Sequence, residues 1–147
     1  MTTVADILKR KGSEVACMDK KKTVLDATIE MNKRRIGALV ILDGDHVAGI
    51  ISERDILTRI VAAKADPSAT RIEQVMTSPI AICLPETTIE ECKNVMTEKR
   101  IRHLPVVKNH KLMGIITSGD ILYQERTKTK ETIKYLEEYI QGPYSTS

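Results

Sequence analysis

The sequence predicts an α/β (α+β) protein that contains two copies of one β-α-β-β-α unit, followed by a C-terminal helix. The first observation is a phrase, GIISERDIL at 49–57, that returns as GIITSGDIL at 114–122. The second is that residues 15–57 align with residues 80–122 without a gap, with about a dozen identical positions. The third is that both copies alternate between helical and strand patterns in the same order.

Each copy opens with a short helical turn and a short strand. VADIL at 4–8 corresponds to IEQVM at 72–76, but at a spacing of 68 rather than 65 residues, so a three-residue difference lies in the loop that follows. Short strands are expected around 15–17 and 80–83. Prolines bracket the second of these, which is consistent with a short strand.

A capped helix follows the first strand in each copy. Thr23 lies three positions before Asp26, and Thr88 lies three positions before Glu91, which is the pattern of a capping box at a helix start. Apolar residues then recur at helical spacing. They are Val24, Ala27, Ile29 and Met31 in the first copy, and Ile89, Cys92, Val95 and Met96 in the second.

Two strands joined by a tight turn, and then a second helix, complete each copy. The runs at 37–42 and 103–107 are short, branched and apolar, and they lead into DGD and KNHK. These turns, with the runs HVAGII and KLMGII that follow them, predict a β-hairpin. The second helix is expected to begin at Ser52 in the first copy and at Thr117 in the second.

The repeat divides the chain into residues 1–65, residues 66–125, and a C-terminal helix and tail at 126–147. One unit of this size buries only a thin core, so we expect the two units to pack sheet to sheet and share one core. In the tail, apolar residues recur at helical spacing before Gly142 and Pro143, which would stop the helix. We expect this helix to pack on the two units or on a dimer mate, and the alternative is that it docks a partner.

Composition indicates an ordinary globular protein without a membrane-spanning or secreted segment. The 147 residues are 41% hydrophobic and 29% charged. The longest apolar run, at 36–42, is far shorter than the roughly 18 residues that a membrane helix needs. The amino terminus lacks the apolar stretch of a secretory signal. We therefore expect a cytoplasmic protein.

Few residues favour a metal, a nucleic acid or catalysis. The three cysteines and three histidines are scattered without metal-ligand spacing, so no metal site is expected. A formal charge of only +3, with no Trp and no Phe, argues against a nucleic-acid partner. No catalytic triad or Walker loop is discernible, which argues against an enzyme.

Both copies resemble CBS (cystathionine-β-synthase) domains, and the pair resembles a Bateman module. The resemblance rests on GIISERDIL and GIITSGDIL, preceded by RRIGALVILDGD and KRIRHLPVVKNH, and it covers residues 1–125. It implies two CBS units packed with pseudo-two-fold symmetry, and two clefts that bind adenosine compounds such as AMP, ADP, ATP, NAD or S-adenosylmethionine. It also implies a homodimer that reports metabolic state to a regulated protein and that needs no catalytic cofactor.

Asp55 and Asp120 are the residues that this resemblance assigns to the ribose. A carboxylate can accept hydrogen bonds from both ribose hydroxyls, and a helix start with open amides favours phosphate. The alternative interpretation is structural. Ser52 with Asp55, and Thr117 with Asp120, also form capping boxes, which would explain the spacing by themselves. The two interpretations are not exclusive.

The other candidate contacts divide between the phosphate and the adenine ring. For the phosphate, we expect hydroxyl and basic groups, namely Ser52, Arg54, Thr117, Ser118, Arg102 and His103. For the adenine, the resemblance points to the strand starts, namely Val15, Ala16, Ile80 and Ala81. Since the second phrase has no arginine, we expect two unequal clefts. The alternative function is a scaffolding or dimerisation protein with no nucleotide ligand.

Overall fold

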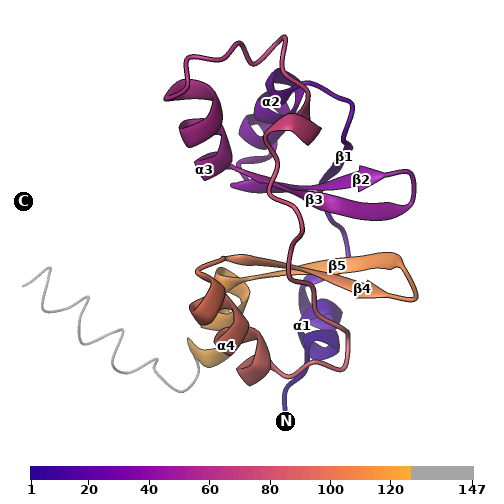
Figure 1. Ribbon diagram of the computed structural model, residues 1–147. Coiled ribbons are helices and arrows are strands. Elements are labelled where there is room, and N and C mark those ends of the chain that lie inside the picture. The colour runs from indigo at the N-terminus through magenta and orange to yellow at the C-terminus, as the bar shows by residue number, and fades with distance from the viewer. Residues whose placement is uncertain (127–147) are drawn as a thin grey trace, which may run out of the picture.

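The described part of the chain, residues 1–126, folds into two small α+β units whose β-hairpins face each other in this computed structural model (Figure 1). The remaining residues, and with them the predicted C-terminal helix, lie outside the described part. The helices and strands in chain order are α1 (Val4–Lys11), β1 (Cys17–Asp19), α2 (Val24–Arg34), β2 (Ala38–Asp43), β3 (His46–Ser52), α3 (Glu53–Ile56), η1 (Leu57–Val61), η2 (Ile72–Gln74), α4 (Ile89–Lys99), β4 (His103–Lys108) and β5 (Lys111–Thr117). Helices cover the outer face of each hairpin.

The first unit holds a three-stranded sheet in the order β1-β2-β3. β1 pairs with β2 in parallel, with Cys17 opposite Val40, and β2 pairs with β3 in antiparallel. The helix α2 begins after Thr23, whose hydroxyl accepts a hydrogen bond from the Asp26 amide at 3.1 Å. The same type of box caps α4 at Thr88. The predicted capping boxes and hairpins are therefore confirmed.

The second unit repeats this hairpin but shortens the first strand. β4 and β5 pair with the register and the bulge of β2 and β3. The strand predicted at 80–83 is reduced to one parallel bridge at Cys83. In the first unit, the Val40 amide donates to the Ala16 carbonyl at 3.1 Å. Pro105 occupies the corresponding position of β4 and has no amide hydrogen, so this hydrogen bond cannot form in the second unit.

The second helix of each unit begins where the repeated phrase predicts. Ser52 caps α3, which continues into a π-helical turn, and residues 118–126 are helical after Thr117. The serine and the threonine of the phrase therefore lie at the junction between a hairpin strand and a helix.

The leading helices exchange places between the two units. α1 precedes the first unit in the chain but packs on the second unit. The Val4 amide donates to the Thr87 carbonyl at 2.8 Å, and the Ile89 amide donates to the Thr2 carbonyl at 3.1 Å. These two hydrogen bonds join the start of α1 to the start of α4.

Matching hydrogen bonds show that the exchange is reciprocal. The segment around η2 precedes the second unit but packs on the first. The Ile72 amide donates to the Lys22 carbonyl at 2.9 Å, and the Val24 amide donates to the Thr70 carbonyl at 2.9 Å. Each half of the chain thus supplies the leading helix of the other half, which is consistent with the predicted pseudo-two-fold symmetry.

Two buried clusters form instead of the single shared core that we expected from the size of the units. One cluster combines α1 with the second unit: Val4, Ile7, Cys83, Ile89, Cys92, Met96, Leu104, Val106, Ile116 and Ile121. The other combines the η2 segment with the first unit: Val24, Ala27, Met31, Leu39, Ile41, Ile51, Ile60, Ile72 and Val75. The expectation of one core is wrong because each unit completes its own apolar layer with the exchanged helix. Between the units, β3 contacts β5.

The helices of the two units are all short. Within residues 1–126, none of them is both long enough and apolar enough to cross a membrane.

Candidate functional site

Asp55 is held at the start of α3 by several hydrogen bonds. Its Oδ2 accepts from the Ser52 amide at 2.9 Å and from the Ser52 hydroxyl at 3.1 Å, and its Oδ1 accepts from the Thr77 hydroxyl at 2.9 Å. The aspartate is buried, and the Arg59 guanidinium lies 4.0 Å from Oδ1. A carboxylate offers about four acceptor positions, so neighbouring residues already use most of those of Asp55.

Asp120 occupies the matching position of the second unit with a different set of partners. Its Oδ2 accepts from the Thr117 amide at 2.8 Å and from the Lys11 ammonium at 2.7 Å. Its side chain is 16% exposed. No residue of the range 1–126 donates a hydrogen bond to its Oδ1. Among the described residues, this oxygen of the second unit therefore keeps its acceptor positions unused.

Lys11 and Thr77 are residues of this site that the sequence did not indicate. Lys11 ends α1 and also donates to the Ile115 carbonyl at 2.9 Å. Thr77 follows η2 and pairs with Ile50 of β3 through two backbone hydrogen bonds. Both residues reach the other half of the chain through the exchange of leading segments. The different spacing of VADIL and IEQVM indicated only that the loops after them differ in length, and it did not reveal this exchange.

The helix starts are less open to phosphate than expected. The Glu53 amide donates to the Gly37 carbonyl at 3.0 Å, and the Ser118 amide donates to the Arg102 carbonyl at 3.0 Å. The aspartate amide of each box is bonded to the hydroxyl of its cap residue as well. A bound phosphate would therefore depend more on side-chain charge than on backbone amides.

The basic residues predicted for the phosphate have different surroundings. Arg54 and Arg102 are exposed, whereas His103 is partly buried at the start of β4. Burial lowers the pKa of His103, and the charge of Arg102 lowers it further. The carboxylates of Asp120 and Glu53 oppose this shift, which places His103 within reach of charges from both units. The lowered pKa favours the neutral form of the imidazole, which can still form hydrogen bonds.

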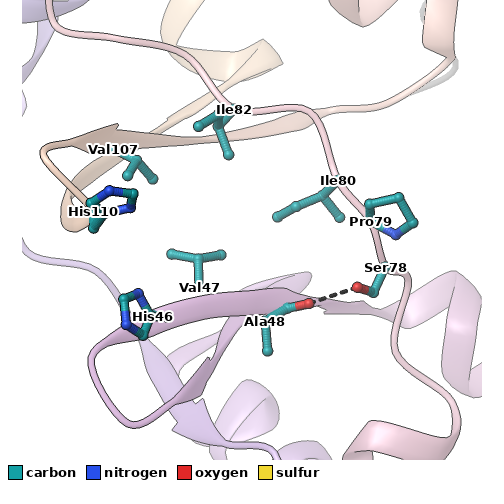
Figure 2. A pocket seen from close by; sticks show the side chains of 9 residues that line it. All are labelled: His46, Val47, Ala48, Ser78, Pro79, Ile80, Ile82, Val107 and His110. Atoms are coloured by element: carbon teal, nitrogen blue, oxygen red, sulfur yellow. Dashed lines mark hydrogen bonds between the residues drawn. The ribbon is translucent and has the colours of Figure 1, made fainter.

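The residues predicted for the adenine are half-buried. Val15 and Ala16 precede β1, while Ile80 and Ala81 lie in the segment that joins the units. Of these, Ile80 lines a cavity of about 290 Å³ between the two hairpins (Figure 2). The other residues that line this cavity are His46, Val47, Ala48, Ser78, Pro79, Ile82, Val107 and His110.

A larger cavity, of about 490 Å³, lies between α2 and α3 on the first unit. It is lined by Thr28, Met31, Asn32, Arg35, Ile36, Glu53, Ile56, Leu57 and Val61. Neither cavity is lined by Asp55 or Asp120. The predicted contacts are therefore spread over helix starts, the joining segment and a hairpin. Among the described residues, no group of three or more potential metal ligands gathers.

These features define a tandem α+β module with a hydroxyl and a carboxylate at matching strand-to-helix junctions. The family profile for the CBS domain matches residues 4–62 and 72–125. The chain therefore belongs to the CBS-domain family and carries two such domains, as the repeated phrase predicted. Pairs of this kind are typically regulatory.

Known proteins of this family match the chain over most of its length. The CBS domain-containing protein CBSX3, mitochondrial, of Arabidopsis thaliana is 33% identical over 97% of this chain and 74% of its own length. A protein with CBS domains from Burkholderia ambifaria MC40-6 is 40% identical, with a TM-score of 0.80 over 84% of this chain and 93% of its own. The CBS domain pair of protein MJ0100, in complex with 5′-methylthioadenosine and S-adenosyl-L-methionine, is 25% identical, with a TM-score of 0.77 over 87% of this chain and 98% of its own.

Proposed function

We propose that this protein is a non-catalytic regulatory module that binds an adenosine-containing ligand at Asp55 and Asp120 and signals metabolic state to a partner protein. The candidate ligands are AMP, ADP, ATP and NAD-type compounds. The proposal is carried by one observation. Both aspartates lie at matching strand-to-helix junctions beside a hydroxyl residue. The complex of the MJ0100 pair with two adenosine compounds supports this ligand class.

In this proposal, each aspartate accepts hydrogen bonds from ribose hydroxyls while it continues to cap its helix. Asp120 has Oδ1 available for this purpose. Asp55 Oδ1 already accepts from the Thr77 hydroxyl at 2.9 Å, so only one of its acceptor positions remains for a ribose hydroxyl. We therefore expect the site at Asp120 to bind the ligand more tightly than the site at Asp55.

The other predicted contacts keep their roles as part of the proposal. The residues proposed for the phosphate are Ser52, Arg54, Thr117, Ser118, Arg102 and His103. The residues proposed for the adenine are Val15, Ala16, Ile80 and Ala81. A ligand held between residues of both units would favour one relative arrangement of the units over another. The size of this effect is limited by the difference in the ligand's affinity for the two arrangements.

The proposed location is the cytoplasm, although CBSX3 is a mitochondrial protein.

A scaffolding or dimerisation protein without a nucleotide ligand is the second candidate. It is favoured by the apolar side chains around the cavity between α2 and α3, where Leu57 and Val61 are each 62% exposed. Exposed apolar patches of this kind mark surfaces of association. Under either candidate function, we propose that the protein forms a homodimer through this surface.

Thermal unfolding with AMP, ADP, ATP, NAD and S-adenosylmethionine tests the proposed function. A ligand at about 100 times its Kd stabilises a protein by roughly 2.7 kcal/mol. For a chain of this size, this corresponds to a rise in Tm of several degrees. We expect at least one of these compounds to produce such a rise.

Asn variants separate ribose binding from helix capping. In Asp120→Asn, the amide oxygen can keep the bonds to Thr117 and Lys11, while the NH₂ group that replaces Oδ1 cannot accept a ribose hydroxyl. The rise in Tm should shrink strongly in this variant and less in Asp55→Asn. No rise with any compound, in folded and ligand-free wild-type protein, would contradict the proposal and favour the scaffold.

A further inference from the structure

Lys11 brings a positive charge to the Asp120 carboxylate from a distant part of the chain. The helix α1 is anchored on the second unit by Val4 and Ile7, which are fully buried. At the end of this helix, the Lys11 ammonium lies 2.7 Å from Asp120 Oδ2 and 2.9 Å from the Ile115 carbonyl oxygen. The Lys11 side chain is 23% exposed. The charge is therefore held in place and is still accessible from solvent.

Both members of this ion pair keep unused hydrogen-bonding capacity. A lysine ammonium has three donors, of which Asp120 and Ile115 use two. Within residues 1–126, nothing donates to Oδ1 of Asp120. A charged donor and a free carboxylate oxygen thus lie side by side. An adenosine phosphate offers the complementary groups, because its ribose hydroxyls donate and its phosphate oxygens accept.

The matching junction of the first unit is arranged differently. There, Asp55 Oδ1 receives a neutral hydroxyl from Thr77 at 2.9 Å. The Arg59 guanidinium lies 4.0 Å away, and its Nη1 donates to the carbonyls of Val75 and Met76 at 2.7 and 3.0 Å. Two contacts to the backbone of the joining segment thus hold this arginine, although a guanidinium keeps further donors. An ammonium in direct contact with the aspartate is therefore a property of the second unit, as far as residues 1–126 show.

We infer that Lys11 makes the proposed site at Asp120 selective for adenosine compounds that carry a phosphate group over adenosine itself. The inference rests on the proposed function, because it requires a ribose at Asp120. The ammonium stands on a flexible four-carbon stem, so it can turn its third donor to a phosphate while it stays beside the carboxylate. A charge-assisted hydrogen bond is stronger than a neutral one. We expect AMP to bind about tenfold more tightly than adenosine, which corresponds to about 1.4 kcal/mol.

Calorimetric titration of the whole chain with adenosine and with AMP tests this inference. In Lys11→Met, most of this roughly tenfold preference for AMP should be lost, while the affinity for adenosine stays within about twofold. Lys11→Arg should keep the preference for AMP because it keeps the charge. Lys9→Met is the matched control. Lys9 is an exposed residue of the same helix, so this variant loses one charge without touching Asp120.

Salt provides a second measurement that needs no variant. The preference of the wild-type protein for AMP should weaken as ionic strength is raised, because salt screens exposed charges. A preference that does not change with salt would overturn the role of Lys11. So would an equal affinity of the wild type for AMP and adenosine, unchanged AMP binding in Lys11→Met, or an equal loss in Lys9→Met. In each of these outcomes adenosine still binds, so the proposed function stands. If no adenosine compound binds, both this inference and the proposed function are wrong.

Discussion

Replacing Ile7 by Ala is expected to destabilise the second unit, although Ile7 precedes the first unit in the chain. Ile7 is 0% exposed and lies in one cluster with Leu104 and Ile116. Truncation of a buried isoleucine typically costs about 2–5 kcal/mol, which is a large share of the roughly 5–15 kcal/mol of a folded domain. Denaturant titration of the variant and the wild type measures this loss.

The control for Ile7→Ala is Ile29→Ala on α2. Ile29 is 57% exposed, so its truncation should change the free energy of unfolding by no more than about 0.5 kcal/mol. Hydrogen exchange then locates the effect of Ile7→Ala, which should reduce the protection of amides in β4 and β5. An unchanged stability, or a loss of protection confined to β2 and β3, would contradict the packing of α1 on the second unit.

Gly49→Ala is expected to disturb the contact between β3 and the segment that joins the units. A Cβ at Gly49 would lie 2.6 Å from the Thr77 carbonyl oxygen and 3.0 Å from the Met76 sulfur. The same carbonyl accepts a hydrogen bond from the Ile50 amide at 3.1 Å, so the segment cannot retreat without loss of backbone pairing. We expect a loss of about 1–3 kcal/mol in the free energy of unfolding.

Gly114→Ala is the natural comparison because Gly114 holds the same place in the second phrase. Its Cβ would meet Leu8, with Cδ2 at 2.7 Å. Leu8 presents a flexible side chain that can change rotamer, so Gly114→Ala should cost clearly less than Gly49→Ala. Thermal or denaturant unfolding of both variants measures the difference. A larger cost at Gly114 would contradict the backbone contact at Gly49.

Local sequence patterns predicted the elements of each unit but not how the halves combine. Thr23 and Thr88 identify helix starts because a capping box involves only neighbouring residues. The hairpins follow from short apolar runs on both sides of a turn. In contrast, the exchange of α1 and the η2 segment depends on long-range packing, and an alignment of the two copies cannot say on which half a helix packs. Pro105, visible in the sequence, explains the missing strand pairing in the second unit.

The sequence predicted the candidate site only in part, because some of its residues come from the exchanged segments. Asp55 and Asp120 belong to the repeated phrase, and the structure places both at strand-to-helix junctions with the expected capping bonds. Lys11 and Thr77 were missed because the exchange brings them there. The expectation of open amides was wrong in part, since carbonyls at the preceding strand starts, such as that of Gly37, already accept from the first helix amides.

An NMR titration of uniformly ¹⁵N-labelled protein with AMP tests most directly whether the two aspartate caps form the ligand site. The account predicts the largest amide shifts at Lys11 and at 115–120, with smaller ones at 52–55 and at Thr77. Shifts confined to the cavity between α2 and α3, or no shifts at saturating AMP, would contradict it.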